Sequence, residues 1–225
     1  MNDTKFSAVI LAAGSASRMN GINKQLALLD DIPVIVRSAL AFERSRMVEE
    51  IIVAAPPGEE QYYFSLLQNH LVTKLKTVVA GGASRAASVM NALVECSCGH
   101  IAIHDGARPL ISTEDIDRVL CDAAEYGAAI AAAPVNDTIK VCSGGNVGST
   151  PDRSTLYAAQ TPQAFRRELY ISCVTRLGSR ADSVTDDSMV LELCGEKVHV
   201  TPVTACNLKI TRPEDLLIAQ AVLRR

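Results

Sequence analysis

Short apolar segments alternate along the chain with segments in which apolar positions recur every three or four residues. The apolar segments are rich in Val, Ile and Ala, and turn residues such as Gly14, Pro56 and Gly81 follow them. This alternation is typical of βαβ units around a parallel sheet. The chain is therefore predicted to be an α/β protein with a mostly parallel sheet flanked by helices.

The pattern predicts five strands and four helices before residue 135. The helix after Gly82 has the clearest apolar stripe, because Val89 and Leu93 lie four residues apart, as do Met90 and Val94. The predicted strands cover residues 7–13, 50–55, 76–80, 100–104 and 128–134, and the predicted helices cover residues 33–42, 59–70, 84–95 and 113–126.

The pattern changes between residues 136 and 160, where helical spacing is lost. Gly144, Gly145, Gly148 and Pro151 separate short strand-like pieces, which favours a protruding β-hairpin arm over another βαβ unit. Helices are predicted again over 165–177 and 186–194, and strands over 199–204 and 208–210. The final helix is predicted to begin at a cap made by Thr211 and Glu214. Residues 1–225 are thus interpreted as one domain with an arm.

Composition narrows the class of protein. Hydrophobic residues make up 48% of the chain and charged residues 21%, which is typical of a globular domain. With 22 basic and 25 acidic residues the net charge is −3, which indicates no general surface for nucleic acid or anionic membranes. No apolar run approaches the roughly 20 residues of a membrane helix. Partners are predicted to exclude nucleic acid and membrane, so any anion site must be local.

The seven cysteines are an odd number without CxxC spacing, which is typical of free thiols in a reducing compartment. The predicted location is the cytoplasm, or the plastid stroma if a transit peptide has been removed. Residues 96–104 contain two cysteines and two histidines, which are residue types that can bind zinc. The apolar strand between His100 and His104 would keep the two histidines apart, which argues against that metal.

Polar and small residues follow the predicted strands, and ligands of parallel sheets bind beyond the carboxyl ends of strands. The first such loop holds Ala12, Ala13 and Gly14, and then the cations Arg18 and Lys24. Small residues let backbone amides approach a phosphate, and two cations can neutralise a polyphosphate. The loop is neither a Walker loop nor GxGxxG, and a tight turn with two solvated cations is the alternative interpretation.

Two further loops strengthen the case for a nucleotide site. Gly81 and Gly82 precede Arg85 and Ser88, although glycines before a helix also make an ordinary connection. Asp105 follows the fourth strand, where a carboxylate is a natural ligand for the magnesium that a nucleotide carries. An ion pair with Arg108 on the surface is the alternative for Asp105. The combination predicts a phosphate-binding edge of the sheet.

Seven motifs stand in the order found in the methylerythritol phosphate cytidylyltransferases, and the resemblance spans nearly the whole chain. They are Ala12-Ala13-Gly14 with Arg18 and Lys24, Gly81-Gly82 with Arg85 and Ser88, residues 104–109, residues 133–140, Arg153 with residues 160–163, residues 185–187, and residues 207–215.

The resemblance implies a Rossmann-like fold similar to that of nucleotide-sugar pyrophosphorylases, with the arm serving homodimer formation. It implies transfer of CMP from CTP to 2-C-methyl-D-erythritol 4-phosphate with release of pyrophosphate, a step of isoprenoid precursor synthesis by the non-mevalonate pathway. The implied cofactor is Mg²⁺ or another divalent cation. The acceptor phosphate is already ionised at neutral pH, so no general base is needed and the histidines are not catalytic candidates. His104 is predicted to be structural.

The resemblance also implies roles for individual residues. Arg18 and Lys24 match cations on the triphosphate, Lys209 matches a cation beside the α-phosphate, and these three are the catalytic candidates. Asp105 matches a metal ligand. The implied nucleotide contacts are Ala12, Ala13, Gly14, Gly81, Gly82, Arg85, Ser88 and Ala107, and the implied acceptor contacts are Arg153, Thr161 and Thr185.

Two alternatives remain open from the sequence. A sister family makes CDP-ribitol on a similar frame, and its strand-end motif more often has serine and valine where this chain has Gly106 and Ala107. The other alternative is a non-catalytic module that binds CTP. That module would leave Arg153, Thr161 and Thr185 without a role.

Overall fold

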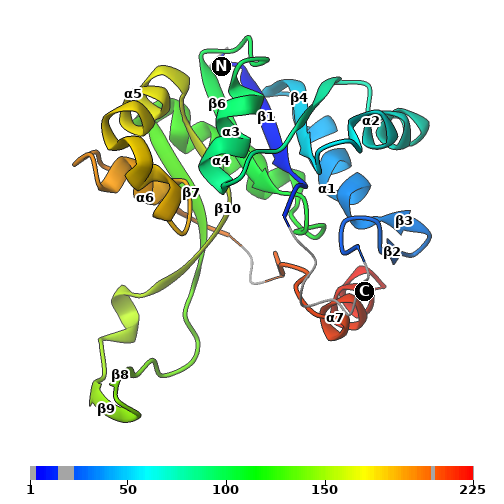
Figure 1. The fold of residues 1–225 in the computed structure, drawn as a ribbon. Coiled ribbons are helices and arrows are strands. Elements are labelled where there is room, and N and C mark those ends of the chain that lie inside the picture. Colours follow the sequence, from blue (N-terminus) through cyan, green and yellow to red (C-terminus); the bar gives the residue numbers. More distant parts are fainter. Residues whose placement is uncertain (1–3, 15–22, 204–205, 225) are drawn as a thin grey trace.

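The structure is a computed structural model that describes residues 4–14, 23–203 and 206–224. The strands of the main sheet are β1 (Phe6–Leu11), β4 (Val48–Ala55), β5 (Leu75–Ala80), β6 (His100–Asp105), β7 (Ala128–Pro134), β10 (Tyr157–Arg166) and β11 (His199–Pro202). Within the described residues they form one sheet of order β11-β7-β10-β6-β1-β4-β5 (Figure 1). All neighbours pair in parallel except β10, which is antiparallel to β6 and β7.

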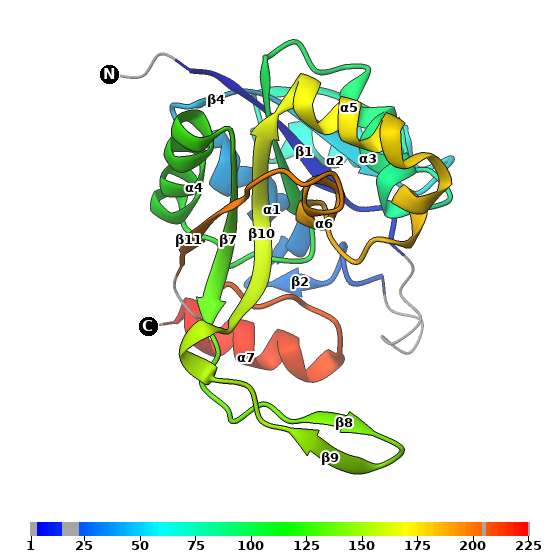
Figure 2. The ribbon, with the colours of Figure 1, turned by 90° about the vertical axis from the view of Figure 1, so that its left-hand side faces the viewer.

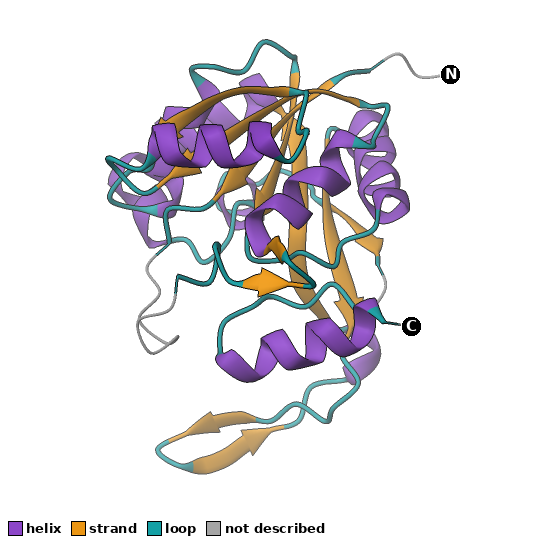
Figure 3. Cartoon of the chain, turned by 90° about the vertical axis from the view of Figure 1, so that its right-hand side faces the viewer, coloured by secondary structure: helices purple, strands orange, loops and turns teal. Residues whose placement is uncertain are grey.

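Helices cover both faces of this sheet (Figure 3). They are α1 (Val34–Glu43), α2 (Glu60–Asn69), α3 (Arg85–Leu93), α4 (Thr113–Tyr126), α5 (Arg167–Leu177) and α6 (Ser188–Glu192). Strand β1 shows why a continuous apolar run is needed here. Ala8 and Ile10 pack with α1, α2 and α4 on one face, whereas Val9 packs with α3, α5 and α6 on the other. The mostly parallel α/β fold predicted from the sequence is confirmed.

The last helix, α7 (Pro213–Leu223), packs beside the small hairpin of β2 (Leu28–Leu29) and β3 (Ile32–Pro33). Its buried Ala219 joins a cluster with Leu29, Ala107 and Ile210. The backbone N–H of Ile210 donates to the carbonyl of Ala107 at 2.8 Å. This small core holds the segment around Lys209 against the loop that follows β6.

The principal error of the sequence prediction concerns β10. Residues up to 160 were predicted to belong to the arm and Phe165 to begin a helix, but residues 157–166 form a strand in the middle of the sheet and α5 begins at Arg167. The prediction failed because Thr161 and Gln163 interrupt the apolar pattern. Both are buried within the strand, and their side chains are satisfied by hydrogen bonds.

Three smaller predictions near the C-terminus are also wrong. Residues 208–210 form no strand; the Ile210 N–H donates to the Ala107 carbonyl in the loop after β6, and the Leu208 N–H donates to the nearby Cys206 carbonyl. Helix α6 is shorter than the predicted 186–194. The acidic side chain at the start of α7 is that of Asp215, one residue after the predicted Glu214, and it accepts from the backbone N–H groups of Thr211 and Arg212 at 2.7 and 2.9 Å.

The arm leaves the sheet between β7 and β10 (Figure 2). It contains the hairpin of β8 (Val141–Ser143) and β9 (Asn146–Ser149), followed by a 3₁₀ turn, η1 (Arg153–Thr155). Every residue from 136 to 150 is exposed, including the apolar side chains of Val141 and Val147. A two-stranded ribbon this short cannot bury a core of its own.

Across the described residues, no helix has the length and apolar character that a membrane crossing requires.

Candidate active site

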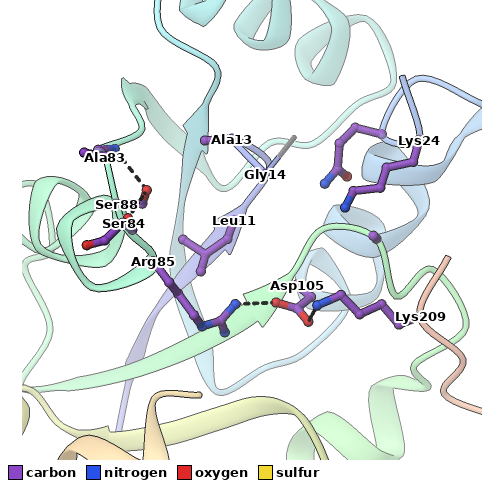
Figure 4. Close-up of a pocket in the computed structure, with 13 residues that line it drawn as sticks. Leu11, Ala13, Gly14, Lys24, Ala83, Ser84, Arg85, Ser88, Asp105 and Lys209 are labelled. Carbon is purple, nitrogen blue, oxygen red and sulfur yellow. Dashed lines mark hydrogen bonds and ion pairs between the residues drawn. The ribbon is translucent and has the colours of Figure 1, made fainter. Parts of the chain in front are cut away.

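Two adjoining clefts lie at the carboxyl ends of the strands. The first has a volume of about 370 Å³ and is lined by the loops after β1, β5 and β6 (Figure 4). The second has a volume of about 240 Å³ and is lined by residues of β10 and of the segment before α6. Arg85, Asp105 and Lys209 line both clefts, and we call these three residues the shared wall. Two ligands bound side by side would meet at this wall.

Small residues shape the first cleft. A Cβ atom on Gly81 would lie only 2.2 Å from the Cβ of Ala13, so a larger residue there would push the loop after β1 out of place. Gly82 is equally restricted, since its Cβ would lie 2.5 Å from the Cβ of Ala87. The close approach of these two loops brings backbone amides to the edge of the cleft, which suits a phosphate-bearing ligand.

Ser88 and Ser84 stabilise the connection from β5 to α3. The Ser88 hydroxyl accepts from the Gly82 N–H at 3.0 Å and donates to the Ser84 carbonyl at 2.9 Å. The Ser84 hydroxyl caps α3 by accepting from the Ala87 N–H. Ser88 was predicted to contact the nucleotide, and it lines the first cleft, but its hydroxyl also fixes the glycine loop.

Asp105 is the centre of an ion-pair cluster at the end of β6. Arg85 Nη1 lies 2.6 Å from Asp105 Oδ1, and Lys209 Nζ lies 2.7 Å from Oδ2, approaching from the opposite side (Figure 4). Arg108 Nε lies 3.5 Å from the same Oδ2. Burial alone would raise the pKa of Asp105, but Arg85 and Lys209 outweigh it and hold that pKa well below its usual range. The carboxylate is therefore ionised at neutral pH.

Thr161 and His104 stabilise the backbone around Asp105. The Thr161 hydroxyl accepts from the Asp105 N–H at 3.0 Å and contacts His104 Nδ1 at 3.1 Å, while His104 Nε2 lies 3.2 Å from the Arg108 carbonyl. Burial lowers the pKa of His104 to about 4, so the ring is neutral. It can accept from Thr161 and donate to the Arg108 carbonyl. These contacts agree with a structural His104, and they give the Thr161 hydroxyl a partner on each side.

Two of the predicted cations, Lys24 and Arg153, lie in different parts of the structure. Lys24 lines the first cleft, where its Nζ lies 3.8 Å from the position of a Cβ on Gly14. Arg18 lies outside the described residues. Arg153 is exposed on the arm, donates to the Asn136 carbonyl at 2.6 Å, and lines neither cleft of its own chain. Of the other acceptor candidates, Thr161 and Thr185 both line the second cleft.

Several residues of the site were assigned no catalytic or binding role from the sequence. Arg108 and Gln163 line the second cleft. The side-chain amide of the buried Asn207 donates to the Thr161 carbonyl at 2.9 Å, and the backbone carbonyl of Asn207 accepts from Arg108 Nη1 at 2.8 Å. Asp187 lies beneath Arg85 with a side chain that is 1% exposed. Arg108, Gln163, Asp187 and Asn207 all fall inside the motifs noted above, which was the available signal.

Comparison with known proteins agrees with this arrangement. A family model described as 2-C-methyl-D-erythritol 4-phosphate cytidylyltransferase matches residues 6–225. A protein of that name from Bacillus cereus is 39% identical over 221 residues, which are 97% of this chain and 98% of the relative. Another from Geobacter metallireducens is 38% identical over 224 residues, 96% of this chain and 97% of the relative.

Solved structures give the same result for the fold. The crystal structure of a 4-diphosphocytidyl-2C-methyl-D-erythritol synthase from Anaerococcus prevotii superposes with a TM-score of 0.88 at 28% identity and covers 100% of both chains. That of a 2-C-methyl-D-erythritol 4-phosphate cytidylyltransferase from Thermus thermophilus has a TM-score of 0.80 at 29% identity, covering 99% of this chain and 100% of the other. The resemblance inferred from the motifs is confirmed, and the chain belongs to the 2-C-methyl-D-erythritol 4-phosphate cytidylyltransferase family.

Proposed function

We propose that this chain transfers CMP from CTP to 2-C-methyl-D-erythritol 4-phosphate across the shared wall, with CTP in the first cleft and the acceptor in the second. The observation that carries this proposal is that two clefts share one wall made of Arg85, Asp105 and Lys209. A transfer between two phosphorylated ligands requires that their phosphates meet at a cationic point, and the wall supplies that point.

The reaction needs positioning and charge more than proton transfer. An oxygen of the acceptor phosphate attacks the α-phosphorus of CTP, a new P–O bond forms, and the bond to the bridging oxygen of the β-phosphate breaks. Pyrophosphate then leaves. Lys209 would offset the negative charge at the α-phosphorus, and Lys24 and Arg18 would hold the triphosphate. Ala12, Ala13, Gly14, Gly81, Gly82, Ser88 and Ala107 would surround the nucleotide.

Asp105 has the chemistry of a ligand for a divalent cation. Mg²⁺ in nucleotide sites is held by one or two carboxylates together with phosphate oxygens. Among the described residues no cluster of three or more His, Cys, Asp or Glu could hold a metal ion, so the protein would supply Asp105 and the nucleotide most of the other oxygens. Mg²⁺, when bound there, would neutralise charge on the triphosphate.

The second cleft fits a phosphorylated acceptor. It is lined by Arg85 and Arg108 in addition to Lys209, and by the polar side chains of Thr161 and Thr185. Arg153 would complete it from a second copy of the chain, because the arm carries this residue away from the clefts of its own subunit. Residues 1–225 would then form a single nucleotidyltransferase domain that works as a homodimer. All seven thiols are free, which supports a cytoplasmic location.

A substrate panel tests the function. Pyrophosphate release is measured with CTP, UTP, ATP and GTP, each paired with 2-C-methyl-D-erythritol 4-phosphate or ribitol 5-phosphate. Release is expected to be fastest with CTP and the methylerythritol acceptor. Faster release with ribitol 5-phosphate would favour the sister activity, equal turnover with ATP would reject a cytidylyltransferase, and CTP binding without any release would indicate a binding module.

A further inference from the structure

Asp187 is a buried carboxylate in the segment that precedes α6. Its side chain is 1% exposed, and it lines neither cleft, although its neighbours Thr185 and Asp186 line the second. A buried carboxylate is costly unless it is paired and hydrogen-bonded. Asp187 meets that condition through Arg85 and Tyr170, so its position depends on both α3 and α5.

The contacts of Arg85 divide its guanidinium into two parts. Nε and Nη2 donate to Asp187 Oδ2 at 3.0 and 2.6 Å, whereas Nη1 donates to Asp105 Oδ1 at 2.6 Å. The other carboxylate oxygen, Asp187 Oδ1, accepts from the Tyr170 hydroxyl at 3.1 Å. Tyr170 of α5 therefore fixes the Asp187 carboxylate, and Asp187 in turn fixes Arg85 at the start of α3.

We propose that Asp187 is a positioning residue for nucleotidyl transfer, which fixes the Arg85 guanidinium so that Nη1 faces Asp105 at the shared wall. The inference rests on the proposed function. An arginine presents its N–H groups as a planar fork that suits bidentate binding of phosphate. Because Asp187 engages Nε and Nη2, this pair of N–H groups is not available to bind a phosphate bidentately, and Arg85 acts at the wall through its charge and its fixed orientation. It remains an oriented part of the wall.

Loss of this contact would change the alignment of the two phosphates more than the affinity for either substrate. Without Asp187, Arg85 could bind the phosphate of the donor or of the acceptor through two N–H groups. That phosphate would then be displaced from the in-line position for attack. A small misplacement of reacting groups is sufficient to slow a reaction by about 100-fold. Asp187 therefore acts on turnover through Arg85 without contacting a substrate.

A double-mutant cycle on the full-length enzyme tests this role. The variants are Asp187→Asn, Arg85→Gln and the double variant, with wild type assayed in parallel. Asp187→Asn is expected to lower kcat by about 10- to 100-fold, by analogy with the loss caused by removing a residue that orients a metal ligand. KM for CTP should change little. In the Arg85→Gln background the same substitution should have an effect of no more than about twofold, because its route to the site is already lost.

Asp182→Asn is the matched control, since it removes a carboxylate from the same segment that contacts Ser84 and not Arg85. It should retain the wild-type kcat. If Asp187→Asn does not fold, Arg85→Lys replaces it, because one ammonium cannot hold Asp187 and Asp105 in the arrangement of the arginine fork. That variant should lose nearly as much turnover as Arg85→Gln.

The outcomes separate the inference from the function. A wild-type kcat for Asp187→Asn or Arg85→Lys would overturn the inference, as would an equal loss from Asp187→Asn in both backgrounds. Either result requires a wild-type enzyme that is active with CTP. Wild-type enzyme without pyrophosphate release would instead overturn the proposed function.

Discussion

Replacing Lys209 by alanine is expected to lower kcat by about 100-fold or more, by analogy with the loss of about 3 kcal/mol of transition-state stabilisation when one oxyanion-hole donor is removed. The fold should persist. Lys209 is 38% exposed, and Asp105 would retain Arg85 and Arg108 as partners. The measurement is the rate of pyrophosphate release at saturating CTP and acceptor, together with circular dichroism.

Lys24→Ala and Arg18→Ala should behave like Lys209→Ala, since both cations are assigned to the triphosphate. Lys197→Ala is the control, because this exposed lysine lines neither cleft. Near-native turnover of the Lys24 and Lys209 variants with CTP saturated would mean that these cations have no role in the transfer step.

Subunit mixing is expected to restore activity that two inactive variants lack by themselves. Lys24→Ala damages the first cleft of its own chain, and Arg153→Ala damages the arm that we assign to the partner's second cleft. In a mixed dimer one site collects both substitutions and the other collects neither. Random exchange should therefore restore about a quarter of native activity, by counting over a two-fold dimer.

The exchange is monitored by native mass spectrometry while pyrophosphate release is followed. If Arg153 serves its own subunit, every site in every dimer carries one substitution and mixing restores nothing. The proposed shared site requires the arm, with its exposed Val141 and Val147, to pack against a second copy of the chain. A monomer at micromolar concentration would therefore also argue against the shared site.

The sequence predicted the site most successfully where function depends on loops after strands. The loops after β1, β5 and β6 carry small residues and charges that together predicted a phosphate site, and Ala13, Gly82 and Asp105 do line one cleft. Topology explains this success. In a parallel sheet the carboxyl ends of neighbouring strands share an edge, so residues far apart in sequence meet there.

The parts that could not be predicted depend on long-range polar contacts. Strand β10 could not be predicted from the sequence because the buried Thr161 and Gln163 also need hydrogen-bond partners from distant parts of the chain. Asp187 resembles an ordinary acidic loop residue until Arg85, 102 positions away, is placed beside it. The place of Arg153 is a further example. The sequence of residues 136–150 does not specify whether the arm extends toward the clefts of its own subunit or toward those of a second copy.

In the proposed reaction, the acceptor phosphate in one cleft attacks the α-phosphorus of CTP in the other. Isotope transfer tests it most directly, with 2-C-methyl-D-erythritol 4-phosphate that carries ¹⁸O in the non-bridging oxygens of its phosphate. Mass spectrometry and ³¹P NMR then locate the label. The product in which CMP is joined to the acceptor phosphate is expected to retain every labelled oxygen, with one in the bridge between its two phosphorus atoms, and pyrophosphate is expected to contain none. Loss of ¹⁸O from the acceptor phosphate, or its appearance in pyrophosphate, would show that the acceptor phosphate is not the nucleophile.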